Sequence, residues 1–241
     1  MDVLLVGDSL GMVALGYDST VPVTMDEMIH HAAAVRRGAA TAFVIGDMPF
    51  GSYQSSPRDA IVNGGRFLKE AGCDAVKLEG GQEVCVTVAA MVAAGIPVMG
   101  HLGLTPQTAS QLGGYKVQGK DLESARKMMA AAEALQQAGA FGLVLECIPE
   151  QLARIISEQL SIPTIGIGAG VHCDGQVLVT HDLLGMFEKF IPSFVKTYVS
   201  LSPLIKDNIL SYAEEVRQGS FPDAAHSFTS QLDLRELLAR K

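Results

Sequence analysis

Short apolar runs alternate with longer amphipathic segments along this chain, and this alternation limits the possible fold more than any other feature. The runs are rich in Val, Ile and Leu with little polar interruption, which is typical of strands buried on both faces of a parallel sheet. Seven such runs are present, at residues 3–7, 41–46, 75–78, 97–100, 142–145, 163–168 and 176–179. The pattern predicts seven parallel strands.

The intervals between the runs carry helix signals. Thr24 is followed three residues later by Glu27, which is a capping box, and Gly72 ends another helical pattern at a typical C-cap position. We expect helices over residues 25–37, 58–71, 121–138, 150–160 and 203–217. Repeated strand–helix units of about 30 residues favour an α/β fold of the (β/α)8 TIM barrel type over an open doubly wound sheet. One strand fewer than a closed barrel needs is visible.

Composition excludes several classes of protein. The chain has 241 residues, of which 48% are hydrophobic, and a net charge of −8, so it is neither disordered nor suited to nucleic acid or an anionic membrane as its main partner. Its N-terminus lacks the basic region of a signal peptide, and glycine and proline interrupt the uncharged stretch at 84–115 well before a membrane span. We expect one barrel domain over 1–241, with a C-terminal helix and tail.

The four cysteines are isolated, and none forms a C-x-x-C pair, which excludes a zinc ribbon and a thioredoxin-type motif. They are expected to be small core residues in a reducing, cytoplasmic setting.

Polar residues stand where successive predicted strands end. In a parallel barrel all these strand ends open on one face, so we expect the side chains to converge in one pocket. A single Asp at such a place is more often a turn former or a helix cap, and it is the recurrence that points to a site. The residues are Asp8, Ser9, Asp47, Lys77, Glu79, His101 and Glu146.

The residue types indicate the chemistry. Asp8, Asp47 and Glu79 offer hard oxygen donors without clustered His or Cys, which suits Mg²⁺ and a substrate with adjacent keto and carboxylate oxygens. Lys77 would offset the substrate carboxylate. Glu146 lies between Leu145 and Cys147, an apolar setting that favours a general base.

Three other features have open or structural interpretations. His101 is either a donor to a residue of the site or a satisfied core histidine, and both interpretations stay open. The stretch 114–121 nearly matches a P-loop, but Asp121 replaces the hydroxyl that would bind Mg²⁺. The glycine-rich stretch 166–170 lacks the dinucleotide-binding spacing, and we expect a tight turn beside the pocket there.

These stretches resemble the ketopantoate hydroxymethyltransferase family. The matching motifs occur in family order over nearly the whole chain. They are LVGDSLGMV (5–13), GYDSTVPVT (16–24), DMPFGSY (47–53), AVKLEGG (75–81), GHLGLTPQ (100–107), GGYKVQG (113–119), LVLECIP (143–149), IPTIGIGAG (162–170) and DGQVLVTHDLLG (174–185).

The resemblance implies a metal-dependent barrel of the phosphoenolpyruvate/pyruvate superfamily. Such an enzyme moves a one-carbon unit from 5,10-methylenetetrahydrofolate to 3-methyl-2-oxobutanoate, giving 2-dehydropantoate in the first step of pantothenate biosynthesis. By the same resemblance Asp8 and Asp47 bind Mg²⁺, or another divalent metal, and substrate, while Glu79 completes the metal site. Ser9 and Lys77 hold the ketoacid, and Glu146 accepts the proton.

The resemblance also implies a homo-oligomer, a decamer of two rings. Family members carry a βα unit ahead of the stretch that matches VLLVGDSLG, so the barrel is expected to lack its first βα unit in this chain. Two rival functions stay open at this stage. One is a Mg²⁺-dependent C–C lyase, which would cleave a ketoacid without folate, and the other is an inactive barrel kept as a scaffold.

Overall fold

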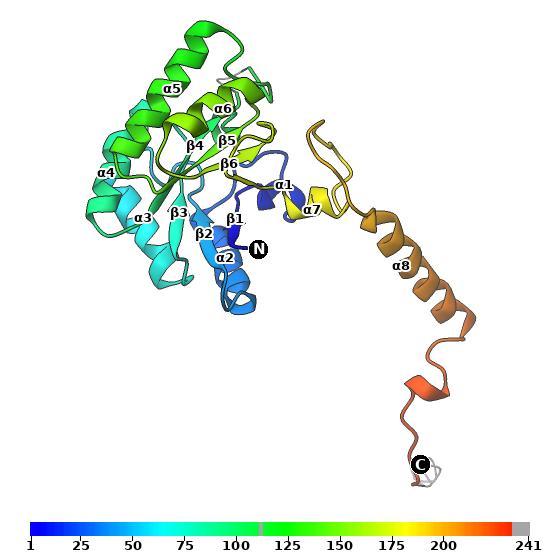
Figure 1. Ribbon diagram of the computed structural model, residues 1–241. Helices are drawn as coiled ribbons and strands as arrows, with labels where there is room; N and C mark the ends of the chain where they lie inside the picture. The colour runs from blue at the N-terminus through cyan, green and yellow to red at the C-terminus, as the bar shows by residue number, and fades with distance from the viewer. Residues whose placement is uncertain (111–112, 233–241) are drawn as a thin grey trace. The chain divides into compact units, whose positions relative to one another are not determined.

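The computed structural model describes residues 1–110 and 113–232 (Figure 1). It divides into two compact units. The first comprises residues 1–179 and 192–195, and the second comprises the described remainder from residue 180 onward. All the residues singled out above as site candidates belong to the first unit.

A seven-stranded sheet forms the centre of the first unit. All strand pairs are parallel, and the strands lie in the order in which they occur along the chain. They are β1 (Val3–Val6), β2 (Phe43–Asp47), β3 (Ala75–Lys77), β4 (Val98–Gly103), β5 (Gly142–Glu146), β6 (Thr164–Ile167) and β7 (Gly175–Gln176). This consecutive order is that of a (β/α) barrel, so the predicted α/β fold is confirmed, with β1 and β7 at the two edges of the described sheet.

Helices connect the strands and lie along the outside of the sheet, as Figure 1 shows for α3, α4 and α5. They are α1 (Leu10–Val13), α2 (Met25–Gly38), α3 (Pro57–Lys69), α4 (Cys85–Ala93), α5 (Leu122–Gln137) and α6 (Glu150–Gln159), with short 3₁₀ turns η1 (Gln82–Val84) and η2 (Pro106–Thr108). The predicted capping box is present: Glu27 N–H donates to Thr24 Oγ1 over 3.2 Å, and Thr24 N–H donates to Glu27 Oε2 over 2.7 Å.

Alternate residues of each strand face opposite sides of the sheet, and each side has its own core. On the helix side Val44, Val76, Val98 and Leu143 are fully buried within a large apolar cluster. Ile45, Ala75, Met99 and Val144 form a second, smaller cluster on the inner side. Burial on both sides explains why the strands read as continuous apolar runs.

Gly46 lets α3 approach β2 closely. A Cβ atom there would lie 2.2 Å from the ring of Phe67, which is fully buried in the outer core. Any side chain at this position would therefore push α3 away from the sheet.

The second unit contains α7 (Thr180–Leu183), α8 (Leu201–Gln218) and the 3₁₀ turn η3 (Ala224–His226). The predicted helix over 203–217 is thus present and begins two residues earlier. The last predicted strand is wrong in its extent: β7 has two residues, and residues 177–179 are not strand. None of the helices in the described part of the chain has both the length and the apolar character that crossing a bilayer requires.

Candidate active site

The period of the strands places four of the candidate residues on the inner side of the sheet. Each follows a residue of the inner core by two positions, so both side chains point to the same face. Asp47 follows Ile45, Lys77 follows Ala75, His101 follows Met99 and Glu146 follows Val144. The inner core therefore passes directly into a polar layer at the carboxyl ends of β2 to β5.

Lys77 lies among three of the other candidates. Its Nζ is 2.8 Å from Asp47 Oδ1, 3.7 Å from Glu79 Oε1 and 3.2 Å from His101 Nδ1. Asp47 and Lys77 are direct neighbours in the register of β2 and β3, which explains the short contact. All four residues are at most 5% exposed, so solvent screens these charges little.

His101 connects this group to Glu146. Its Nε2 is 3.2 Å from Glu146 Oε2, and its Nδ1 is 3.5 Å from Glu79 Oε1. Of the two interpretations of His101, the structure therefore favours the donor to a residue of the site. The Glu146 side chain keeps 17% of its surface exposed, so it is the more accessible of the two carboxylates.

Asp8 lies just past the end of β1 and joins the group through β2. Its backbone N–H donates to Asp47 Oδ2 over 3.1 Å, and its side chain is buried. Ser9 is half-buried at the start of α1, where its side chain makes no capping hydrogen bond. The structure thus brings Asp8, Asp47, Lys77, Glu79, His101 and Glu146 together, with Ser9 next to Asp8 in the chain.

The charges of this group do not balance. Burial and the neighbouring charge of Asp47 raise the pKa of Asp8 well above its usual value, and burial likewise raises the pKa of Asp47 in spite of Lys77. Burial acts to lower the pKa of Lys77, but the charges of Asp47, Glu79 and Asp8 outweigh it and raise that pKa. The three buried carboxylates of Asp8, Asp47 and Glu79 outnumber the two basic side chains beside them, Lys77 and His101, so the group has room for a further positive charge.

Glu79 and His101 differ from the two aspartates. Burial acts to raise the pKa of Glu79, but Lys77 and His101 hold it below its usual value. Burial and Lys77 act to lower the pKa of His101, yet the hydrogen bonds to Glu146 and Glu79 outweigh them and raise it to about 9. The imidazole is thus placed to keep a proton between two carboxylates.

The donor set fits a hard cation such as Mg²⁺. In the described ranges no group of three His, Cys, Asp or Glu side chains stands in a metal-binding arrangement. The carboxylates of the site already have protein partners. One Glu79 oxygen is near Lys77 and His101, and the other accepts from the Gln107 N–H. The two Asp47 oxygens pair with Lys77 and with the Asp8 N–H. Mg²⁺ often takes only one or two protein carboxylates and keeps several waters. Asp8 and Asp47 offer two such carboxylates.

Two buried residues of the site were missed by the sequence analysis. Gln107, on η2, and Tyr53, in the loop after β2, contact the backbone or side chain of Glu79 and contact each other over 2.9 Å. Both lie in stretches that carry the family resemblance, DMPFGSY and GHLGLTPQ, but hydrophobic periodicity places neither of them. The sequence signal that could have identified them is their position in the turns after β2 and β4, at the strand ends where the site lies.

The two sequence features rejected as nucleotide-binding motifs have structural roles. Asp121 caps α5, accepting hydrogen bonds from the N–H groups of Glu123 and Ser124 over 3.0 and 2.9 Å. In the glycine-rich stretch, Gly168 and Gly170 adopt positive φ angles of 62° and 79°, as a tight turn requires.

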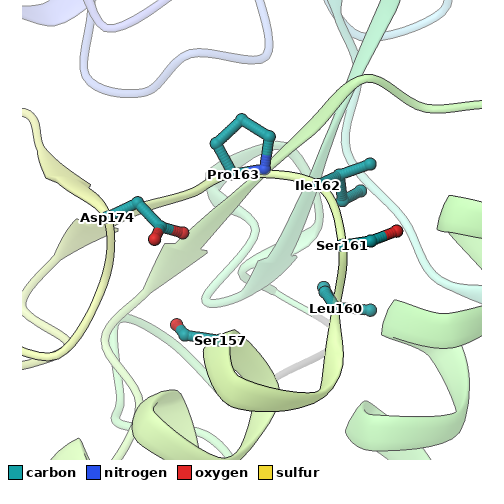
Figure 2. Close-up of a pocket in the computed structure, with 6 residues that line it drawn as sticks. All are labelled: Ser157, Leu160, Ser161, Ile162, Pro163 and Asp174. Atoms are coloured by element: carbon teal, nitrogen blue, oxygen red, sulfur yellow. The ribbon is translucent and has the colours of Figure 1, made fainter.

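A cavity of about 300 Å³ lies at the amino end of β6 (Figure 2). It is lined by Ser157, Leu160, Ser161, Ile162, Pro163 and Asp174. Asp174 Oδ2 accepts hydrogen bonds from Thr164 N–H and Oγ1 over 2.8 and 3.0 Å, so its charge holds the start of the strand. This cavity lies at the amino end of the strands, whereas Glu146 lies at their carboxyl end. The polar side chains of Asp174 and Ser157 hydrogen-bond to Thr164 of β6 and so stabilise the start of that strand.

Comparison with known proteins identifies the family. Among solved structures, a putative lyase/mutase from Burkholderia cenocepacia superposes with a TM-score of 0.53 at 16% identity over 99% of this chain and 84% of its own, a likeness in fold. The 3-methyl-2-oxobutanoate hydroxymethyltransferase of Desulfotalea psychrophila is 64% identical over 99% of this chain and 86% of its own length. That of Moorella thermoacetica is 62% identical over 95% and 85%. The family model for ketopantoate hydroxymethyltransferase matches residues 1–224, and this chain therefore belongs to the ketopantoate hydroxymethyltransferase family.

Proposed function

We propose that this chain transfers a hydroxymethyl group from 5,10-methylenetetrahydrofolate to 3-methyl-2-oxobutanoate, giving 2-dehydropantoate in the first step of pantothenate biosynthesis. The observation that carries the proposal is the buried polar layer on β2 to β5, in a chain 64% identical to an enzyme of that name. The methylene carbon forms a bond to C3 of the ketoacid, water supplies the hydroxyl oxygen, and tetrahydrofolate leaves.

Glu146 is the general base in this proposal. Its carboxylate removes the proton from C3 of the ketoacid, and the resulting enolate attacks the methylene carbon. Two features support the role: Glu146 keeps part of its surface open, and His101 Nε2 is 3.2 Å from its Oε2. A histidine that pairs with this oxygen as an ion-pair partner orients the carboxylate for proton transfer.

Asp8 and Asp47 would hold Mg²⁺, with Glu79 reached through water. When bound, the ion supplies a Lewis acid for the keto oxygen and offsets the negative charge that develops there. Lys77 orients Asp47 and Glu79 through its two ion pairs. Its positive charge also offsets the negative charge of the ketoacid carboxylate. Ser9, beside Asp8, donates its hydroxyl to the substrate.

We also propose a homo-oligomer, a decamer as the resemblance implies, in the cytoplasm. The described cysteines are all free thiols, in keeping with a reducing compartment. In α8 no side chain is buried, and apolar residues stand exposed on it, among them Leu204, Ile205, Ile209 and Leu210. A helix of this kind is suited to association with another copy. Sedimentation velocity tests the proposed oligomer. A protein that sediments as a monomer at micromolar concentration would contradict it.

A turnover assay with both substrates tests the proposed activity. We expect product only when folate, ketoacid and divalent metal are all present, loss of turnover with a chelator, and recovery when Mg²⁺ is added back. Asp47→Asn should lose most activity and bind Mg²⁺ more weakly, because an uncharged amide is a poorer ligand for a hard cation. Excess metal should restore part of it.

Three results would contradict parts of the proposal. Cleavage of the ketoacid without folate would instead assign a lyase. Full activity in chelator would remove the metal role. No turnover under any of these conditions would point to an inactive scaffold.

A further inference from the structure

Gln107 makes hydrogen bonds with both polar groups of its side-chain amide. Its Nε2 donates to Asp8 Oδ2 and to the Met48 carbonyl, each over 2.9 Å. Its Oε1 accepts from Tyr53 OH over 2.9 Å and from Gln54 Nε2 over 3.3 Å. The residue is only 3% exposed, so this buried amide is held in one orientation by partners on several sides.

The orientation of the amide follows from its neighbours. A backbone carbonyl can only accept, so the atom of Gln107 that faces Met48 O must be the NH₂ group. The same NH₂ group therefore meets Asp8 and donates to its Oδ2. The backbone N–H of Gln107 donates in addition to Glu79 Oε2 over 3.1 Å. One residue thus connects the two acids that come from β1 and from the end of β3.

The three acids differ in how their side chains are held. Asp47 is braced by Lys77 and by the Asp8 N–H, and Glu79 by Lys77, His101 and the Gln107 N–H. Over residues 1–110 and 113–232, the Gln107 amide supplies the one side-chain hydrogen bond to the Asp8 carboxylate. Without that amide the carboxylate can rotate about its terminal bond, and its second oxygen loses a defined direction.

We propose that Gln107 is a positioning residue that orients the Asp8 carboxylate, and with it Glu79, for binding a divalent cation. This inference rests on the metal centre of the proposed function and adds the residue that preorganises it. Gln107 acts through Asp8 and Glu79 and touches neither substrate nor metal. Residues that orient metal ligands in this way contribute about 10- to 100-fold to metal affinity.

Titration with Mn²⁺, followed by electron paramagnetic resonance of the free ion, tests the proposal on the full chain. Gln107→Met keeps the length of the side chain and the backbone N–H but removes the amide. We expect its Kd for Mn²⁺ to rise about 10- to 100-fold. At saturating Mn²⁺ the turnover should recover, because the ligands themselves are intact.

Gln136→Met is the matched control. The Gln136 amide also makes several hydrogen bonds, accepting from Ser161 N–H over 2.7 Å and from Ile162 N–H over 3.3 Å, but it lies on α5 and holds the loop before β6. This variant should lose thermal stability and keep the parent Kd for Mn²⁺. Unchanged Mn²⁺ affinity in folded Gln107→Met, or an equal loss of affinity in both variants, would overturn the inference.

Tyr53→Phe keeps the inference testable if circular dichroism shows that Gln107→Met does not fold. It removes the hydroxyl that holds Gln107 Oε1 and leaves the ring in place. We expect a smaller rise in the Kd for Mn²⁺, and an unchanged Kd would overturn the inference. Absence of saturable Mn²⁺ binding by the unaltered chain would instead overturn the metal centre itself, and this inference with it.

Discussion

The two ends of the parallel sheet use acidic residues in opposite ways. At the amino end, Asp74 Oδ2 accepts from the Val44 N–H over 2.8 Å and from Arg36 Nη1 over 3.2 Å, and Asp174 holds the start of β6. At the carboxyl end, Asp8, Asp47 and Glu79 cluster around Lys77. The first set satisfies backbone groups of neighbouring strands, whereas the second sets like charges close together.

The exposure and the pKa of these acids show which of the two sets stabilises the fold. The ion pair of Asp74 and Arg36 leaves each side chain 34% exposed, so both charges keep part of their hydration. The carboxyl-end acids are almost fully buried, and burial raises the pKa of Asp8 and Asp47 rather than stabilising their charge. An unfavourable cluster of this kind is expected where ligands or chemistry require it.

The largest effect should come from Glu146→Gln at the carboxyl end. The base is proposed to remove the C3 proton of 3-methyl-2-oxobutanoate without folate, so in D₂O the unaltered protein should exchange that proton for deuterium. The amide keeps the shape but cannot act as a base, and exchange should fall by about 10²–10⁴. Nuclear magnetic resonance of the ketoacid measures it. Exchange at the parent rate in a folded variant would assign the base to another group, His101 first.

Lys77→Met should cost the most stability. Removing the lysine leaves Asp47 and Glu79 buried without their cation, a loss of about 3–5 kcal/mol in the free energy of unfolding. Urea unfolding followed by circular dichroism measures it.

The loss caused by Lys77→Met should depend on pH. Lys77 holds the pKa of Glu79 below its usual value of 4.5, so this part of the stability is present above that pH and fades as the pH falls below it. The deficit of the variant should therefore shrink in acid. A deficit independent of pH would show that Lys77 acts by packing alone.

Asp74→Ala breaks the corresponding contact at the amino end. It removes the acceptor of the Val44 N–H and should lower the free energy of unfolding by about 1–3 kcal/mol. Because the change is at the other end of the sheet, Mn²⁺ affinity and C3 exchange should match those of the unaltered protein. A change in either would show that the two ends are coupled.

The smallest effect is expected from Arg36→Met. It is the amino-end counterpart of Lys77→Met, but its ion pair is partly exposed, and we expect a loss of about 0.2–1 kcal/mol. The same unfolding measurement gives the ratio of the two losses directly. Equal losses from the two variants would remove the distinction between the two ends of the sheet.

Strand periodicity explains how much of the site was accessible from sequence. Asp47, Lys77, His101 and Glu146 each follow an inner-core residue by two positions, so apolar patterning alone places them at one end of the sheet. Gln107 and Tyr53 reach the same place from turns after β4 and β2, and the path of such turns depends on tertiary contacts that no local period encodes. The extent of β7 was overestimated because an apolar run continues past its two paired residues.

The consecutive order of the strands has a consequence for synthesis on the ribosome. β1 and β2 precede β3 in the chain, so Asp8 and Asp47 leave the ribosome before Lys77 does. A nascent sheet of β1 and β2 would then carry the carboxylates of Asp8 and Asp47 without Lys77. Lys77 on β3 is needed before these negative charges are compensated. Because domains form from the N-terminus onward during synthesis, we expect the pairing of β1 with β2 to be completed only after β3 has emerged. Divalent cations in the medium would shorten the delay, so the ion proposed for catalysis would also assist the nascent chain.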